Sequence, residues 1–209
     1  MKNRLLPFLV FIIIFKSNCQ NTIVGEYSFH RQEMVAGFLF EKTGKFQFFY
    51  SYGAVDRTAT GSFTVKNDSL FLKSDKLAGK DFTIKSEAKK GKGYSIKVED
   101  KNSYLVRGVR CIFFYDNGKA MEGVTDDKGE FKTDLAKVDK IYLMHPLFED
   151  VPSQIKDEKN TNNNFVVSLN PSLGQVSFKG INFHIKDKNT ITCLPNYFMN
   201  LENIKFVKQ

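Results

Sequence analysis

Short apolar runs separated by turn residues constrain the fold of this chain more than any other feature. Apolar and polar residues alternate from Gly61 to Lys66, a turn follows at Asn67 and Asp68, and an apolar return runs from Ser69 to Lys73. Such alternation places one face of a strand in the core and the other in solvent. The pattern recurs along the chain, and we expect at most one helical turn, at 195–202. The sequence therefore predicts an all-β protein, an antiparallel meander or small barrel followed by a β-sandwich-like module.

Polar breaks divide the chain into three expected parts. Residues 1–18 form a signal peptide, 19–103 an N-terminal antiparallel β module, and 104–209 a β-sandwich with a C-terminal hairpin. The internal boundary is placed at the polar stretch from Asp100 to Ser103, just before a new apolar run. Strands are expected on both sides of this break at the spacing of sandwiches and barrels.

The first residues have the layout of a secretory signal. A charged tip, Met1 to Arg4, precedes the almost wholly apolar run from Leu5 to Phe15. As a helix this run would be about 17 Å long, short of the roughly 30 Å hydrocarbon core of a bilayer. We therefore expect export with cleavage and disfavour an uncleaved spanning anchor.

Cys19 can be interpreted in two ways. The segment Lys16-Ser17-Asn18-Cys19 resembles a bacterial lipobox, which implies that the chain is cut before Cys19 and that its sulfur carries a lipid. The family prefers a Leu-like residue at the place of Lys16 and a small residue at that of Asn18. The alternative is ordinary cleavage after Cys19, with Gln20 as the new terminus. The first interpretation predicts an outer-membrane-anchored lipoprotein of the cell envelope, and the second a soluble periplasmic or secreted protein.

The remaining cysteines and the net charge limit the disulfides and the binding partners that can be expected. Lipidation of Cys19 would leave Cys111 and Cys193, an even pair that could form a disulfide in an oxidising compartment or stay as two buried apolar residues. The formal net charge is +8, and loss of Lys2, Arg4 and Lys16 with the leader leaves +5. The lysines are scattered along expected strands, so a solvated surface is favoured over a binding patch, and no nucleic-acid partner is expected.

The first half resembles the small lipocalin-like β modules of bacterial envelope lipoproteins. The similarity rests on Gly25-Glu26-Tyr27, Gly44-Lys45-Phe46, Gly61-Ser62-Phe63 and the run from Asn67 to Leu72. It implies a barrel-like module, with a carrier of a small apolar ligand as an alternative function. Phe63 stands where the family often has tryptophan.

The second half is similar to carboxypeptidase regulatory-like domains, which are prealbumin-type β-sandwiches. The similarity rests on the stretch from Gly118 to Phe131, whose Thr125-Asp126-Asp127-Lys128-Gly129-Glu130-Phe131 matches the family's turn and return strand. It implies a non-catalytic accessory or interaction module. The residues agree with a turn, because Asp126 or Asp127 can accept backbone N–H bonds and Gly129 can adopt a positive φ. The chain lacks the strand that the family usually has between Gly123 and the turn.

No catalytic motif is found in the sequence. His30, His145 and His184 lack a second ligand at metal-binding spacing, and Asp126, Asp127 and Glu130 fit a hairpin turn better than a calcium loop. We therefore expect no enzyme, no cofactor and no metal, with an envelope hydrolase as the less favoured alternative.

Neighbouring aromatic residues from Phe46 to Tyr52 must point to opposite faces of a strand, so some rings are expected outside the core, where they could meet a glycan or protein partner. The expected function is a membrane-anchored binding or structural module. The oligomeric state stays open.

Overall fold

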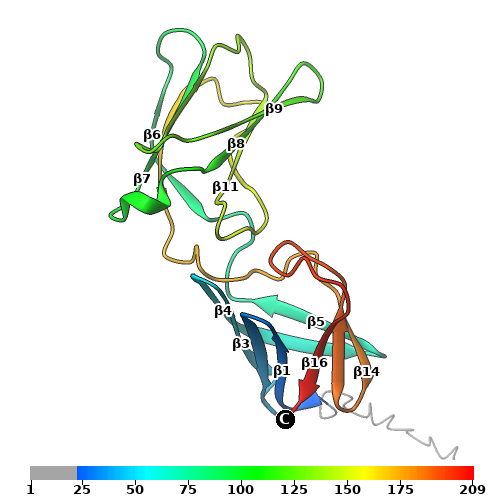
Figure 1. Ribbon diagram of the computed structural model, residues 1–209. Helices are drawn as coiled ribbons and strands as arrows, with labels where there is room; N and C mark the ends of the chain where they lie inside the picture. The colour runs from blue at the N-terminus through cyan, green and yellow to red at the C-terminus, as the bar shows by residue number, and fades with distance from the viewer. Residues whose placement is uncertain (1–22) are drawn as a thin grey trace, which may run out of the picture.

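The computed structural model describes residues 23–209 and is all-β, as predicted from the sequence. A closed eight-stranded barrel and a module of two four-stranded sheets are stacked end to end (Figure 1). The expected signal peptide, residues 1–18, and Cys19 lie outside the described residues.

The barrel is antiparallel and draws its strands from both ends of the chain. Its order is β1-β16-β15-β14-β5-β4-β3-β2. The hairpin predicted from Gly61 to Lys73 is confirmed as the pair of β4 and β5, and β2 and β3 form a further hairpin. The strands are β1 (Gly25–Arg31), β2 (Met34–Phe40), β3 (Lys45–Tyr52), β4 (Val55–Lys66), β5 (Ser69–Ser74), β14 (Phe183–Asp187), β15 (Thr190–Cys193) and β16 (Ile204–Lys208).

The C-terminal hairpin completes the barrel, whereas the sequence placed it with the sandwich in residues 104–209. Strand β16 pairs with β1 at Tyr27 and Lys208, and β14 pairs with β5 at Phe183 and Leu70. A five-stranded meander would leave two unpaired edges, and the last three strands remove both by closing the sheet. The structural division of the chain therefore differs from the expected ranges 19–103 and 104–209.

The second module consists of two four-stranded sheets, ordered β10-β7-β13-β6 and β12-β11-β8-β9. The polar break at Asp100 to Ser103 lies inside this module, between β7 and β8, and a 3-10 helix follows it (η2, Ser103–Leu105). The chain enters the module after β5 and leaves it after β13. The strands are β6 (Phe82–Ala88), β7 (Tyr94–Glu99), β8 (Arg110–Tyr115), β9 (Lys119–Val124), β10 (Glu130–Thr133), β11 (Lys140–Met144), β12 (Ser153–Lys156) and β13 (Asn164–Leu169).

Some local predictions differ from the structure. Strands β6 and β7 do not pair with each other, because β13 lies between them and runs parallel to β7. Strand β12 was not expected. The segment Val176 to Phe178 lies outside any named strand, with a φ of 55° at Phe178, and the expected helical turn at 195–202 does not form.

The turn before Phe131 forms as expected. Asp126 Oδ1 accepts the backbone N–H groups of Lys128 and Glu130 at 2.9 and 2.8 Å, and Gly129 has a φ of 75°. A side chain at Gly129 would also meet the carbonyl oxygen of Val98. The hydrogen bonds that the backbone N–H groups of Glu130 and Lys128 donate to the Asp126 carboxylate lower its pKa. This turn therefore depends on one carboxylate and one glycine.

Each module has its own hydrophobic core. Phenylalanine dominates the barrel core, with Phe38 at the centre of a cluster of rings whose centroids lie 4.7 to 6.2 Å from its own. Alternation along β3 sends Phe46, Phe48 and Tyr50 inward and leaves Phe49 on the outer surface. The prediction that some rings lie outside the core is confirmed.

Candidate functional site

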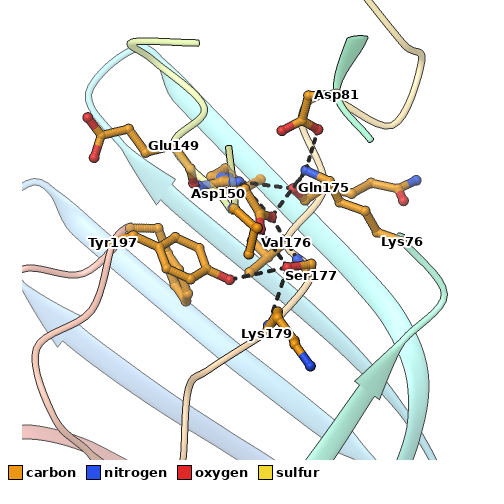
Figure 2. Close-up of polar contacts among 12 residues, drawn as sticks. Lys76, Asp81, Glu149, Asp150, Gln175, Val176, Ser177, Lys179 and Tyr197 are labelled. Carbon is orange, nitrogen blue, oxygen red and sulfur yellow. Dashed lines mark hydrogen bonds and ion pairs between the residues drawn. The ribbon is translucent and has the colours of Figure 1, made fainter. Parts of the chain in front are cut away.

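A buried cluster of charged side chains lies where the two modules meet. Arg57 comes from β4 and Lys76 from the segment after β5, whereas Asp81 precedes β6 and Asp150 precedes β12. Ser177 lies on the segment that returns the chain to the barrel (Figure 2). Arg57 thus comes from the barrel and Asp150 from the sandwich, whereas Lys76 and Asp81 lie on the segment that connects β5 to β6.

Lys76 joins two carboxylates and a backbone carbonyl. Its Nζ lies 2.7 Å from Asp81 Oδ1 and 3.1 Å from Asp150 Oδ2, and donates to the carbonyl oxygen of Gln175 at 2.9 Å. The side chains of Lys76 and Asp150 are completely buried. Because a buried charge is costly without partners, these contacts are what allow Lys76 to remain inside the protein.

Arg57 contacts the Asp150 carboxylate and two backbone carbonyl groups. Its guanidinium donates to the carbonyl oxygens of Glu149 at 2.6 Å and Gln175 at 2.9 Å, and lies 3.8 Å from Asp150 Oδ2. Burial lowers the pKa of Arg57, and the nearby Asp150 opposes this change. Arg57 therefore ties β4 of the barrel to the segment that leads into β12.

Asp150 is the centre of this network. Burial by itself would raise the pKa of Asp150, but the Ser177 hydroxyl, the charge of Lys76 and backbone N–H groups together hold it below its ordinary value. Ser177 donates both its hydroxyl and its backbone N–H to this carboxylate. At Asp81, in contrast, burial raises the pKa and Lys76 only partly offsets it. The surroundings therefore favour the ionised form more strongly at Asp150 than at Asp81.

The buried network connects the two modules, and its charged groups are out of reach of a substrate. Tyr197 lies at its edge, with its hydroxyl 3.5 Å from Ser177 Oγ. Burial raises the pKa of Tyr197, and the charge of Asp150 raises it further. Beside it is a cleft of about 160 Å³ lined in part by Tyr50, Tyr52 and Arg57. This volume is small compared with typical ligand pockets of about 300 to 1,000 Å³. We assign the cluster a structural role at the module junction.

A broad open hollow lies on the outer face of the sheet β12-β11-β8-β9. Strand β8 directs Cys111 and Phe113 into the core, so its alternate residues, Ile112 and Phe114, face outward. The Phe114 ring meets that of Tyr142 on β11 edge to face, with centroids 5.7 Å apart. We call this hollow, of about 800 Å³, the ring groove; its lining is Ile112, Phe114, Asn117, Gly118, Lys137, Asp139, Lys140, Tyr142, Val151, Pro152 and Glu158.

The rim of the ring groove carries charges of both signs. Lys140 Nζ lies 3.1 Å from Glu158 Oε1, and Lys137 Nζ lies 3.8 Å from Asp139 Oδ1. The Glu158 carboxylate raises the pKa of Lys140. Because two amines are matched by two carboxylates, this rim offers many hydrogen-bond donors and acceptors with little net charge.

A second hollow lies on the outer face of the barrel. The ring of Phe49 covers Gly37, where an added Cβ would come within 2.5 Å of it. The hollow has a volume of about 650 Å³, and His30, Gln47 and Thr58 are among its lining residues. A glycine is therefore required under Phe49 to let the ring lie on the sheet.

The cysteines and histidines named from the sequence do not meet. Cys111 lies in the sandwich core and Cys193 on β15 of the barrel, and both are free thiols, so the possible disulfide between them does not form. Burial raises the pKa of each thiol to about 12. His145 is buried at the end of β11, where Nδ1 accepts from the Leu147 N–H and Nε2 donates to the Leu105 carbonyl oxygen. Burial lowers the pKa of His145.

Metal-binding clusters and membrane-spanning helices are both missing from residues 23–209. This part of the chain contains no group of three or more histidine, cysteine or acidic residues placed to bind a metal ion. In the same range, no helix has the length and apolar character needed to cross a bilayer.

Comparisons with known proteins return no match. No protein-family model matches this chain, and neither the curated proteins nor the solved structures include a significant match.

The charged cluster was missed by the sequence reasoning, although one signal was present. Along β4, Arg57 shares its face with Ala59, Gly61 and Phe63, all of which are buried. A charge at an inward position of a strand needs a buried partner. Asp150 lies in a loop without periodicity, so no pattern identified it as that partner.

Proposed function

We propose that this protein is a non-catalytic lipoprotein of the cell envelope, anchored through lipid on Cys19, that binds a partner with its sandwich module. The lipobox-like segment before the first strand supports the anchor. The resemblance of the second half to carboxypeptidase regulatory-like domains supports an accessory role. Acyl chains would hold the protein at the membrane with about 0.8 kcal/mol per buried CH₂ group.

The ring groove is the observation that carries the binding role. Its two aromatic side chains are partly buried on an open sheet face, and aromatic patches that reach the surface commonly mark contact sites. Aromatic rings can stack on the apolar faces of sugars, and the charge-balanced rim offers donors and acceptors to hydroxyl groups. We therefore propose an envelope glycan as its ligand.

Mutation of the ring groove tests this proposal. We expect the purified full-length protein to co-sediment with peptidoglycan sacculi, and the double variant Phe114→Ser with Tyr142→Ser to bind about tenfold more weakly, since each stacked ring contributes about 0.5 to 1.5 kcal/mol. Tyr52→Ser removes a ring that is more exposed, on the barrel, and should leave binding unchanged. Wild-type protein that stays in the supernatant, or equal losses in both variants, would contradict a glycan role for the groove.

The anchor has its own test. We expect intact-mass analysis of the membrane fraction to show acyl mass on the wild-type protein and none on Cys19→Ala, which should be retained less strongly. The reason is that Cys19 is the residue whose sulfur would carry the diacylglycerol. A wild-type protein without acyl mass that is released in soluble form would favour the alternative cleavage after Cys19.

The alternative functions have weaker support. A lipocalin-like carrier needs an open apolar cavity, but phenylalanine rings such as Phe38, Phe46 and Phe178 fill the described barrel core. An envelope hydrolase needs titratable groups within reach of its substrate, and Asp150 with Lys76 is sealed from solvent. The binding role therefore remains the favoured one.

A further inference from the structure

The barrel has one end at which the chain begins its first strand and finishes its last. Gly25 of β1 is opposite Phe40 of β2, and Tyr27 is opposite Lys208 of β16, so the turn after β2 and the C-terminus lie at this end (Figure 1). The antiparallel pairings place the turns after β4 and β14 there as well. The opposite end of the barrel faces the sandwich module.

Lysines are concentrated on these three turns. Lys42 and Lys45 flank the first turn, Lys66 precedes the second, and Lys186 and Lys188 belong to the third. All five are exposed, and none forms an ion pair with another residue in 23–209. We call this surface the lysine end.

The carboxylates of the same turns are fewer and partly engaged. Glu41 accepts hydrogen bonds from Thr43 and Gln47, and Asp187 accepts the backbone N–H of Asn189, whereas Asp68 is exposed without a side-chain bond among the described residues. Glu26 and the C-terminal carboxylate also lie at this end. On the turns themselves, five lysines therefore outnumber the three carboxylates of Glu41, Asp68 and Asp187.

The start of the described chain is fixed at this end. Ile23 is completely buried and belongs to the barrel core. Four residues take the chain from Cys19 to Ile23, a reach of at most about 14 Å even when fully extended. A lipid on Cys19 would therefore hold the lysine end close to the bilayer surface.

We propose that the lysine end is the membrane-facing surface of the protein and contacts anionic lipid headgroups. This inference rests on the proposed lipid anchor. Exposed amines near a negatively charged bilayer gain favourable electrostatic energy within about a Debye length, and a basic surface reinforces an acyl anchor. With this end on the membrane, the stacked arrangement of the modules places the sandwich, which carries the ring groove, on the side of the barrel away from the bilayer (Figure 1).

Lysine footprinting on membranes tests the orientation. The acylated full-length protein is reconstituted into vesicles of phosphatidylcholine alone or with phosphatidylglycerol, treated with a water-soluble acetylating reagent, and analysed by mass spectrometry. We expect the five amines of the lysine end to react about tenfold more slowly on the anionic vesicles, with recovery in high salt. Lys85, Lys89 and Lys92, exposed on the sandwich, should react equally on both. Equal rates at the lysine end on the two vesicles would overturn the proposal.

A second measurement tests the contribution of the lysines to membrane binding in the absence of the acyl chains. In a Cys19→Ala background, we expect K42Q/K66Q/K188Q to co-sediment with phosphatidylglycerol vesicles about 100-fold more weakly than the parent, because each lysine near an anionic surface contributes about fivefold. The charge-matched control K85Q/K89Q/K92Q should bind like the parent. A control that loses as much affinity as the test variant would overturn the inference. Absence of acyl mass on the wild-type protein would instead contradict the anchor alone.

Discussion

At the residue scale, Asp150 has the clearest individual role. It contacts Lys76, Arg57 of the barrel, and both the hydroxyl and the N–H of Ser177. A buried ion pair adds little net stability, yet removing one partner leaves an uncompensated charge. Replacement of the Asp150 carboxylate alone should therefore weaken the contact between the two modules.

Asp150→Asn should destabilise the protein by about 3 to 5 kcal/mol, because Lys76 keeps its buried charge with only Asp81 as an ionic partner. Urea denaturation monitored by circular dichroism measures the free energy of unfolding. Asp68→Asn changes an exposed carboxylate and should stay within about 0.5 kcal/mol of the wild type. Equal stability of the two variants would refute a central role for Asp150.

The lowered pKa of Asp150 also predicts a pH dependence with a definite sign. A carboxylate with a lower pKa in the folded state stabilises the fold above its unfolded pKa of about 3.9, and this contribution disappears as the pH falls through the folded pKa. The raised pKa of Asp81 acts in the opposite direction. The stability difference between wild type and Asp150→Asn should therefore shrink as the pH falls below about 4.

At the element scale, strand β16 decides whether the barrel is closed. It pairs with β15 on one side and β1 on the other, and so joins the last part of the chain to the first. Its residues alternate, with Ile204 and Phe206 in the core and Val207 outside. Phe206 contacts the rings of Phe29 and Phe38 from the N-terminal strands.

Two neighbouring substitutions test this closure. Phe206→Ala should cost about 3 to 5 kcal/mol, since it removes a fully buried ring from the barrel core. Val207→Ala, one residue further on an exposed face, should cost less than about 0.5 kcal/mol. Hydrogen exchange of β1 and β2 amides, measured alongside urea unfolding, should accelerate only in the first variant. Unchanged exchange in β1 would contradict the shared barrel.

At the scale of the whole molecule, two β modules are joined by two chain segments and one buried charge network. The chain leaves the barrel after β5 and returns before β14, so the sandwich is inserted between barrel strands. The network fastens the modules at the points where these segments pass. The sandwich module, which carries the ring groove, therefore lies on the side of the barrel opposite the lysine end (Figure 1).

The sequence by itself determined the features that depend on neighbouring residues. Alternation predicted the all-β class and the hairpin of β4 and β5, and Asp126 with Gly129 predicted a turn, because side-chain direction and turn geometry are local properties. Alternation also indicated that β3 exposes some of its rings. The properties of Cys19 remain predictions.

Only the tertiary structure decided which strands close the barrel and where the charges meet. Arg57 and Asp150 are far apart in the chain, and so are Tyr27 and Lys208, yet each pair meets through the fold. Alternation shows that a segment forms a strand, but it does not show which distant strand pairs with it. For the same reason, the inward position of Arg57 on β4 is a local signal, whereas its partner Asp150 is found only in the fold. Sheet closure and burial of charge are properties of the assembled molecule, because they depend on partners that no local pattern specifies.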